Sequence, residues 1–265
     1  MSPALATIVV PLLRQQDAWL DKSLASAAAQ TAPTELLVIT APCTPASNLA
    51  ILDRVQAPAH VRVRVAPQTG HGFANALNTG IHLATTDRVG FLLSDDWLDP
   101  DAILESASVD ADLVSTGMIR IDERDAELPH LRRMVHAEGL AKRTTDEQRA
   151  AYLTHFLLFR RATLIDAGGL DETLGDAPGI DDYDLVWTLL ERGARVGFTD
   201  RPLYHCRVHA GERLTMRDRD AQTATLERIF DKHAFHGAAR AQRLAEHARW
   251  FGRPEDEVWR ELRAD

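Results

Sequence analysis

The segment FLLSDDWLDP, residues Phe91–Pro100, joins an apolar run to a cluster of carboxylates. Its first part completes Val89–Leu93 (VGFLL), which has the continuous apolar character of a buried strand. Asp95 and Asp96 follow at the carboxyl end of that strand, where α/β sheets bind their ligands. Adjacent carboxylates repel each other, and a divalent cation shared with substrate phosphates would offset that repulsion. The structural alternative is a solvated acidic turn in which Asp99 caps the next helix.

Similar apolar segments precede this strand and alternate with helical patterns. Ala6–Leu13, Glu35–Thr40 and Val61–Ala66 have the apolar, partly β-branched composition of buried strands. Asp17 is placed to cap a helix after the first of them, and a glycine-punctuated helix is expected over Gly72–Ala84. The alternation predicts an α/β fold with a mostly parallel central sheet flanked by helices.

The second half of the chain alternates charged and apolar stretches. Arg120–Thr145 is highly charged and weakly periodic, which predicts a long surface excursion or a mobile lid. Asp184–Glu191 has a helical pattern that ends at Gly193. The tail from Gly211 onward has apolar residues at helical spacing. Packed helices there would either dock on their own domain or join two chains as a homodimer.

The composition excludes several classes of protein. Its 265 residues suffice for one large α/β domain with an appendage. The net charge of −9 disfavours a general nucleic-acid binder. The longest apolar run near the start, Leu5–Leu13, is far shorter than the ~20 residues of a membrane span. Cys43 and Cys206 supply neither a disulfide framework nor a metal cluster, as expected of reduced thiols in the cytoplasm.

A second acidic cluster and several histidines are further candidates for chemistry. Asp181 and Asp182 open a helix, so they either complement the helix dipole or supply a general base for an acceptor hydroxyl. Each of His205 and His209 is able to complete a metal site made otherwise of oxygen ligands, and His209 is the stronger candidate. The two histidines of His233–His236 have no nearby ligand set in the sequence, so we expect them on a solvated helix face.

Taken in their order along the chain, five motifs resemble those of family 2 glycosyltransferases with a GT-A fold. The resemblance spans about residues 6–210. The segments that carry it are GHGFANALNTGIHLA at Gly70–Ala84, FLLSDDWLDP at Phe91–Pro100, FRRATLIDAGGLDE at Phe159–Glu172, IDDYDL at Ile180–Leu185 and RPLYHCRVH at Arg201–His209. The expected organisation is a GT-A catalytic domain over residues 1–210 and a C-terminal helical extension over residues 211–265.

The resemblance implies roles for individual residues. Asp95 would lie near the ribose or diphosphate of a nucleotide-sugar donor. Asp96 and His209 would bind the divalent cation, Mn²⁺ or Mg²⁺. Asp182 would be the general base, beside Asp181, which stands where the family more often has Glu.

Other residues would border the donor. Asn78 would line its pocket, although the residue alone fits an exposed helix face equally well. Four basic residues would help to cover the phosphates, but a plain solvated loop is the interpretation we favour for them: Arg132, Arg133, Lys142 and Arg143.

Two departures from the family pattern concern the nucleoside pocket. Thr40–Pro42 follows the second expected strand, where the family usually has aspartates that recognise the base. Pro11–Arg14 ends the first strand, where the family commonly has Thr, an aromatic residue and Asn. Pro11, Leu13 and Thr40 are therefore expected at a changed donor site, and UDP is not implied.

The resulting hypothesis is a metal-dependent inverting glycosyltransferase of the hexosyltransferase type. It would move a sugar from a nucleotide-sugar donor to an acceptor hydroxyl in one displacement, with the cation stabilising the departing nucleoside diphosphate. The changed nucleoside pocket motivates an alternative, a non-catalytic nucleotide-sugar-binding or partner module with the same fold. A nucleotidyltransferase built on the same sheet is a third and weaker alternative.

Overall fold

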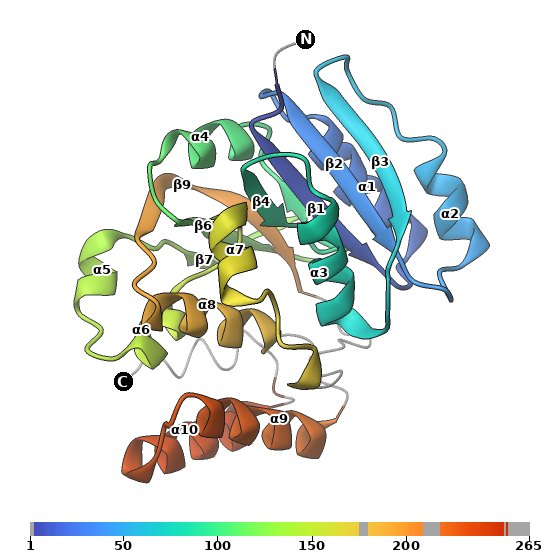
Figure 1. The fold of residues 1–265 in the computed structure, drawn as a ribbon. Helices are drawn as coiled ribbons and strands as arrows, with labels where there is room; N and C mark the ends of the chain where they lie inside the picture. Colours follow the sequence, from blue (N-terminus) through green and yellow to red (C-terminus); the bar gives the residue numbers. More distant parts are fainter. Residues whose placement is uncertain (1–2, 175–179, 209–217, 252, 254–265) are drawn as a thin grey trace.

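The computed structural model describes residues 3–174, 180–208, 218–251 and 253, and Figure 1 shows their arrangement around a central sheet. Within this part of the chain, the strands follow the order β3-β2-β1-β4-β8-β6-β9-β5, and β7 pairs with β6. The strands are β1 (Ala6–Leu12), β2 (Thr34–Thr40), β3 (Val61–Pro67), β4 (Arg88–Phe91), β5 (Trp97–Leu98), β6 (Leu113–Ile121), β7 (Glu127–Arg133), β8 (Leu157–Arg160) and β9 (Val196–Arg207).

Helices cover both faces of this sheet. They are α1 (Asp17–Ala28), α2 (Ala46–Leu52), α3 (Gly72–Leu83), α4 (Ala102–Ser108), α5 (Ala137–Ala141), α6 (Asp146–Tyr152), α7 (Arg161–Ala167), α8 (Asp181–Glu191), α9 (Arg219–Lys232) and α10 (Gly237–Trp250), with a short 3₁₀ helix, η1, at Glu172–Leu174. The glycine-punctuated helix and the helix that ends before Gly193 are thus confirmed as α3 and α8.

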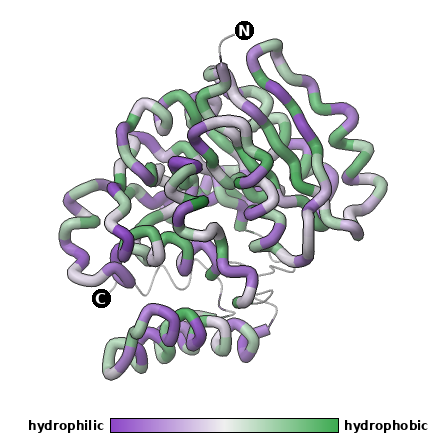
Figure 2. Tube along the Cα trace, viewed as in Figure 1, coloured by the Kyte–Doolittle hydropathy of each residue, from purple (hydrophilic) through white to green (hydrophobic). Residues whose placement is uncertain are grey.

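The apolar strands are buried because successive side chains enter two separate cores. Val9 and Leu37 pair across β1 and β2 and pack in one core with apolar residues of α3, α7, α8 and α9. Ile8 and Leu36 pair one residue earlier and pack in the other core with residues of α1, α2 and α4. Side chains alternate across a strand, so a strand covered on both faces is apolar throughout. Figure 2 shows this apolar centre and the more polar outer helices.

The sheet is parallel from β3 to β4 and mixed beyond it. β8 runs antiparallel to both β4 and β6, whereas β9 runs parallel to β6. The short β5 pairs antiparallel with β9, which places Trp97 opposite His205 and Leu98 opposite Tyr204. The segment after β4 is therefore held against the end of β9, although the two are far apart in the sequence.

The segment Arg120–Thr145, expected as a surface excursion or lid, lies largely at the surface but contains regular secondary structure. β6 continues to Ile121 and forms an antiparallel pair with β7, and α5 follows. Arg133 fixes this hairpin by donating to the carbonyl oxygen of Tyr152 at 2.7 Å. β7 is only partly buried, and a charged, exposed edge strand lacks the apolar pattern by which strands are recognised in a sequence.

Of the two predicted helix caps, the one at Asp17 was wrong, and the one at Asp99 agrees with the structure. α1 begins at Asp17 itself, and the Asp17 carboxylate accepts a hydrogen bond from Asn48 Nδ2 at 2.8 Å. Asp99 Oδ1 accepts the backbone N–H of Asp101 at 3.1 Å, just before α4 begins at Ala102. Its other oxygen pairs with Arg201 at 3.0 Å. Both aspartates connect segments that are distant in the sequence.

The described part of the C-terminal tail docks on its own chain. Leu226, Ile229 and Phe230 of α9 are buried in the core that contains α3 and α8. This apolar face is therefore buried against its own domain, and the homodimer alternative stays a prediction. Figure 1 shows α9 and α10 beneath α8. Among the described residues, none of the helices combines the length and apolar character needed to cross a bilayer.

Candidate active site

Asp96 is a buried anchor for β9. Its side chain lies in the turn after β4 and is only 2% exposed. One carboxylate oxygen accepts a hydrogen bond from the Tyr204 hydroxyl, and the other accepts one from the backbone N–H of Arg207 at 2.7 Å. Burial, with a smaller contribution from the charge of Asp95, raises the pKa of Asp96 to about 7. Each oxygen of the predicted metal ligand thus accepts one hydrogen bond from its own chain, and its metal role stays a prediction.

Arg207 fixes the same turn from the other side. Its side chain is fully buried and donates to the backbone carbonyl oxygens of Asp95 and Asp122, each at 2.9 Å. It also forms an ion pair with Asp125 and lies 4.9 Å from the centre of the Trp19 ring. Asp95, whose side chain is half-buried, is the carboxylate of the pair that reaches the surface of this turn.

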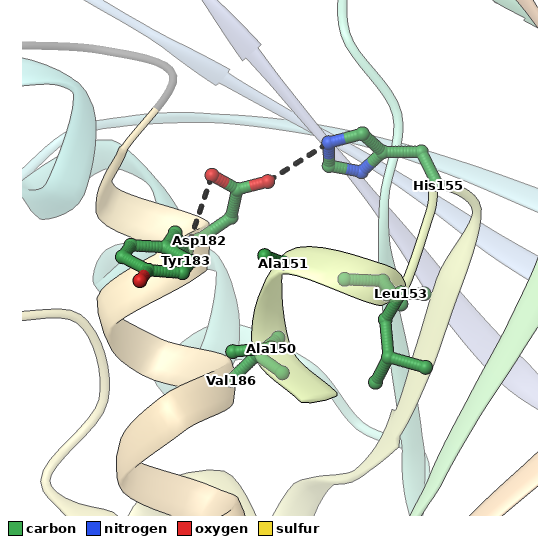
Figure 3. A pocket seen from close by; sticks show the side chains of 8 residues that line it. Ala150, Ala151, Leu153, His155, Asp182, Tyr183 and Val186 are labelled. Carbon is green, nitrogen blue, oxygen red and sulfur yellow. Dashed lines mark hydrogen bonds and ion pairs between the residues drawn. The ribbon is translucent and has the colours of Figure 1, made fainter. Parts of the chain in front are cut away.

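Asp182 lies at the start of α8 and contacts a histidine that sequence reasoning missed. Its Oδ2 atom is 2.9 Å from Nε2 of His155, which comes from the segment between α6 and β8. Its Oδ1 atom accepts the backbone N–H of Tyr183 at 3.0 Å. The two side chains are exposed to similar extents, 29% for Asp182 and 28% for His155. Figure 3 shows the two side chains in contact, among the residues that line a pocket.

His155 links the two acidic clusters. Its ring lies 5.6 Å from the ring of Tyr204, whose hydroxyl donates to Asp96. Burial alone would lower the pKa of His155, but the hydrogen bond and charge of Asp182, together with the charge of Asp96, raise it above its usual value. The two carboxylates, far apart in the sequence, therefore act on one imidazole and lie in the same region of the fold.

The pocket beside this pair has a volume of about 150 Å³. Apolar side chains of α6, β8 and α8 form most of its wall, and Asp182 and His155 supply its ionisable groups. The lining residues are Ala150, Ala151, Leu153, His155, Leu157, Asp182, Tyr183 and Val186. A mostly apolar hollow with a few convergent polar groups has the character of a small-molecule binding site.

The C-terminal extension supports one wall of the pocket. The Tyr183 hydroxyl donates to Glu147 of α6 at 2.8 Å, and Arg243 of α10 donates to the same oxygen at 2.7 Å. Burial, reinforced by the charge of Glu147, raises the pKa of Tyr183, so the phenol stays protonated. α6, α8 and α10 are thus joined at one buried carboxylate.

Asn78 has partners other than a donor. Its side-chain amide exchanges hydrogen bonds with the backbone of Leu170 and donates to Glu172 at 2.8 Å. It also lies against Gly169, where the positive φ of 74° favours glycine and a Cβ atom would collide with the amide. Asn78 is therefore buried and holds the GGLDE loop, rather than lying on an exposed helix face. Its expected place in the donor pocket stays a prediction.

The residues expected at the nucleoside pocket lie near one edge of the sheet. Pro11 is buried near the end of β1, Leu13 is exposed just beyond it, and Thr40 ends the neighbouring β2. β4 runs parallel to β1, so Asp95 follows a strand end at this same edge. A hydrogen bond of 3.3 Å between Gln15 and Ser94 joins the two segments. Their contact with a donor stays a prediction.

Other candidates from the sequence have structural roles or lie outside the described chain. Arg143 donates to the carbonyl oxygen of Gly139 at 2.6 Å. Burial lowers the pKa of Arg133, which binds backbone carbonyls, to about 10. The covering of phosphates by these two arginines, and by Arg132 and Lys142, stays a prediction.

The other histidine and aspartate candidates are His205, Asp181 and His209. His205 is buried and stacked on Trp97, and burial lowers its pKa to about 4, which leaves it neutral at pH 7. Asp181 is buried at the start of α8, and its catalytic role stays a prediction. His209, the second expected metal ligand, lies outside the described residues. Within the described residues, no three His, Cys, Asp or Glu side chains cluster as a preformed metal site.

The expectation for the HAFH segment was wrong at His233. This ring is buried and stacked 4.2 Å from Trp187, and its two nitrogens contact Asp184 and Glu191. Its carboxylate partners come from α8, which is distant in the sequence. The residues next to His233 in the sequence therefore did not indicate this contact.

The model of the family described as "Glycosyltransferase like family 2" matches residues 3–252. The chain belongs to glycosyltransferase family 2. It is also similar to the O-antigen biosynthesis protein RfbC of Myxococcus xanthus, with 32% identity over 206 residues. That match covers 77% of this chain but only 16% of RfbC.

Solved structures confirm the GT-A fold. S. aureus TarS (residues 1–349) in complex with UDP-GlcNAc superposes with a TM-score of 0.66 at 17% identity, over 92% of this chain and 71% of TarS. The mannosyltransferase PcManGT of Pyrobaculum calidifontis in complex with GDP-Man and Mn²⁺ gives a TM-score of 0.62 at 17% identity, over 94% of this chain and 70% of PcManGT.

Proposed function

We propose that this protein transfers a sugar from a nucleotide-sugar donor to an acceptor hydroxyl with inversion at the anomeric carbon. The observation that carries the proposal is the partly exposed Asp182 carboxylate, which contacts His155, lines a pocket and lies near the Asp95–Asp96 turn. The nucleotide-sugar complexes of TarS and PcManGT are consistent with it.

Asp182 is the general base in this reaction. It accepts the proton of the acceptor hydroxyl while that oxygen attacks the anomeric carbon. The bond between this carbon and the diphosphate oxygen breaks, and the bonding electrons leave with the nucleoside diphosphate. Attack from the side opposite the leaving group inverts the configuration. The 150 Å³ pocket lies on the Asp182 side, where the acceptor belongs.

A divalent cation, Mn²⁺ or Mg²⁺, fits one carboxylate of the turn after β4. These cations commonly take one or two carboxylates and complete their coordination with substrate phosphates and water. We assign this role to Asp95, because Asp95 is half-buried whereas the Asp96 side chain is only 2% exposed. His209 remains the proposed second ligand. When bound, the cation would neutralise charge on the departing diphosphate.

The proposal extends to the donor nucleotide, the domain organisation and the cellular compartment. Pro11, Leu13 and Thr40 stand where the family usually has nucleoside contacts. We therefore propose a nucleotide-sugar donor without assuming that its nucleotide is UDP. We also propose that residues 211–265 extend a catalytic domain formed by residues 1–210, and that the protein acts in the cytoplasm.

The test is a panel of nucleotide sugars with and without Mn²⁺, read by thermal shift and then by product analysis. The proposal expects one donor to raise the melting temperature with Mn²⁺ and to release a nucleoside diphosphate and a glycoside of opposite anomeric configuration. Donor binding without turnover would identify the non-catalytic module. Release of pyrophosphate would identify a nucleotidyltransferase.

A further inference from the structure

We propose that His155 is a positioning residue for the proposed base, holding the Asp182 carboxylate in the orientation needed to receive the acceptor's proton. This inference rests on the proposed function. It assigns a role to a histidine between α6 and β8 that the expected motifs did not include.

The hydrogen-bond arrangement gives the Asp182 carboxylate one orientation. An ionised carboxylate only accepts hydrogen bonds, so Nε2 of His155 carries the hydrogen in their 2.9 Å contact. The other oxygen accepts the backbone N–H of Tyr183 at 3.0 Å. With one donor on each oxygen, rotation of the carboxylate would break a hydrogen bond. Each oxygen keeps capacity for another partner, which leaves room for an acceptor hydroxyl.

The backbone on both sides of His155 is anchored to β6. Thr154 donates through its hydroxyl to the carbonyl oxygen of Thr116 at 2.7 Å, and its N–H donates to the Ser115 hydroxyl at 3.1 Å. The N–H of Phe156 donates to the Thr116 hydroxyl at 2.9 Å. All three bonds are buried, and Phe156 itself is fully buried. The imidazole is therefore carried by a fixed segment, as a group that orients a base should be.

Groups from four elements surround the imidazole. Asp182 comes from α8, Tyr204 from β9, Asp96 from the turn after β4 and Arg120 from β6. Asp182 contacts the ring directly, with 2.9 Å between its Oδ2 atom and Nε2. The geometry therefore directs His155 at the proposed base, and the other groups modulate its charge.

The kinetic experiment compares His155→Ala, His155→Gln and a surface control, His82→Gln, in the full chain with the donor found by the panel. Displacing a reacting group by about 1 Å costs roughly 100-fold, so we expect His155→Ala to lower kcat about 10- to 100-fold with little change in the donor KM. Gln offers an N–H close to the position of Nε2, so His155→Gln should recover most of the rate. Wild-type kcat in His155→Ala would overturn the proposal, as would a Gln variant no faster than the Ala variant.

A measurement without turnover separates this proposal from the proposed function. The His155 ring is titrated by NMR in the wild type and in Asp182→Asn, with assignment from the spectrum of His155→Gln. We expect the midpoint to fall in Asp182→Asn, because the carboxylate that favours the imidazolium is gone. An unchanged midpoint would show that the pair does not form and would overturn the inference. A lowered midpoint in a protein that turns over no donor would support the contact and count against the proposed function.

Discussion

Two neighbouring aspartates, Asp95 and Asp96, have different surroundings and therefore different chemistry. The sequence places both at the end of a strand, and sequence reasoning assigned the metal to Asp96. In the structure Asp96 is buried and binds Tyr204 and Arg207, so it anchors β9. We propose that the metal role belongs to Asp95, and no observation yet tests either assignment. This distinction depends on β9, which reaches the turn only through tertiary folding, so the local pattern did not contain it.

Removing the Tyr204 hydroxyl should destabilise the fold. In Tyr204→Phe, one oxygen of the buried Asp96 carboxylate loses its donor, and an unsatisfied buried polar group costs about 1–3 kcal/mol. Urea unfolding followed by circular dichroism measures the change in the free energy of unfolding. A variant as stable as the wild type would show that Tyr204 does not satisfy Asp96 in solution.

At the scale of elements, the sequence predicted the strands with continuous apolar character, and α3 and α8 through their glycines and periodicity. It did not predict β7, whose side chains are largely exposed, because its pairing with β6 leaves no apolar pattern. His155 was also missed. It lies in an apolar segment, and its partner Asp182 is brought to it by the packing of α6 against α8.

α9 is held by a histidine whose contribution should depend on pH. Both nitrogens of His233 contact carboxylates, Asp184 at 3.1 Å and Glu191 at 2.8 Å, which requires the doubly protonated ring. Burial lowers the pKa of His233, but these two carboxylates outweigh it and raise the pKa above its usual value. The stabilisation is therefore complete below about pH 6.5, the usual pKa of an unfolded histidine, and is lost as the pH rises through the higher folded pKa.

Urea unfolding across pH 5.5–8.5 tests this prediction in the wild type and in His233→Gln. The free-energy difference between them should be largest at low pH and shrink as the pH rises. The difference isolates His233 from other titrating groups, including Lys232, which also pairs with Asp184. A difference that is constant across the range would rule out the charged form of His233 as the source of the stability.

α10 should stabilise the pocket wall through a single arginine. Arg243→Ala leaves the buried Glu147 with Tyr183 as its remaining partner in this cluster, and we expect a loss of about 1–3 kcal/mol in the free energy of unfolding. Arg240→Ala is the matched control on the same helix, because Arg240 pairs with the exposed Asp231, and such pairs contribute about 1 kcal/mol or less. Equal losses in the two variants would contradict a special role for Arg243.

At the scale of the whole molecule, the order of motifs along the chain was enough to predict the GT-A fold, and the structural neighbours confirm it. The sequence also predicted that the two acidic clusters converge, and His155 now connects them. The sequence did not predict where the C-terminal helices pack. The apolar face of α9 fits either its own core or a second chain, and only the tertiary packing shows the former.

The most direct test measures nucleoside diphosphate release from the donor by the wild type, Asp182→Asn and a surface control, Asp166→Asn. The Asp182 variant should lose at least about 100-fold in kcat, since a general base contributes about 10²- to 10⁴-fold, while its donor-induced thermal shift and the activity of the control stay unchanged. Wild-type turnover by Asp182→Asn would contradict the assignment of Asp182 as the base.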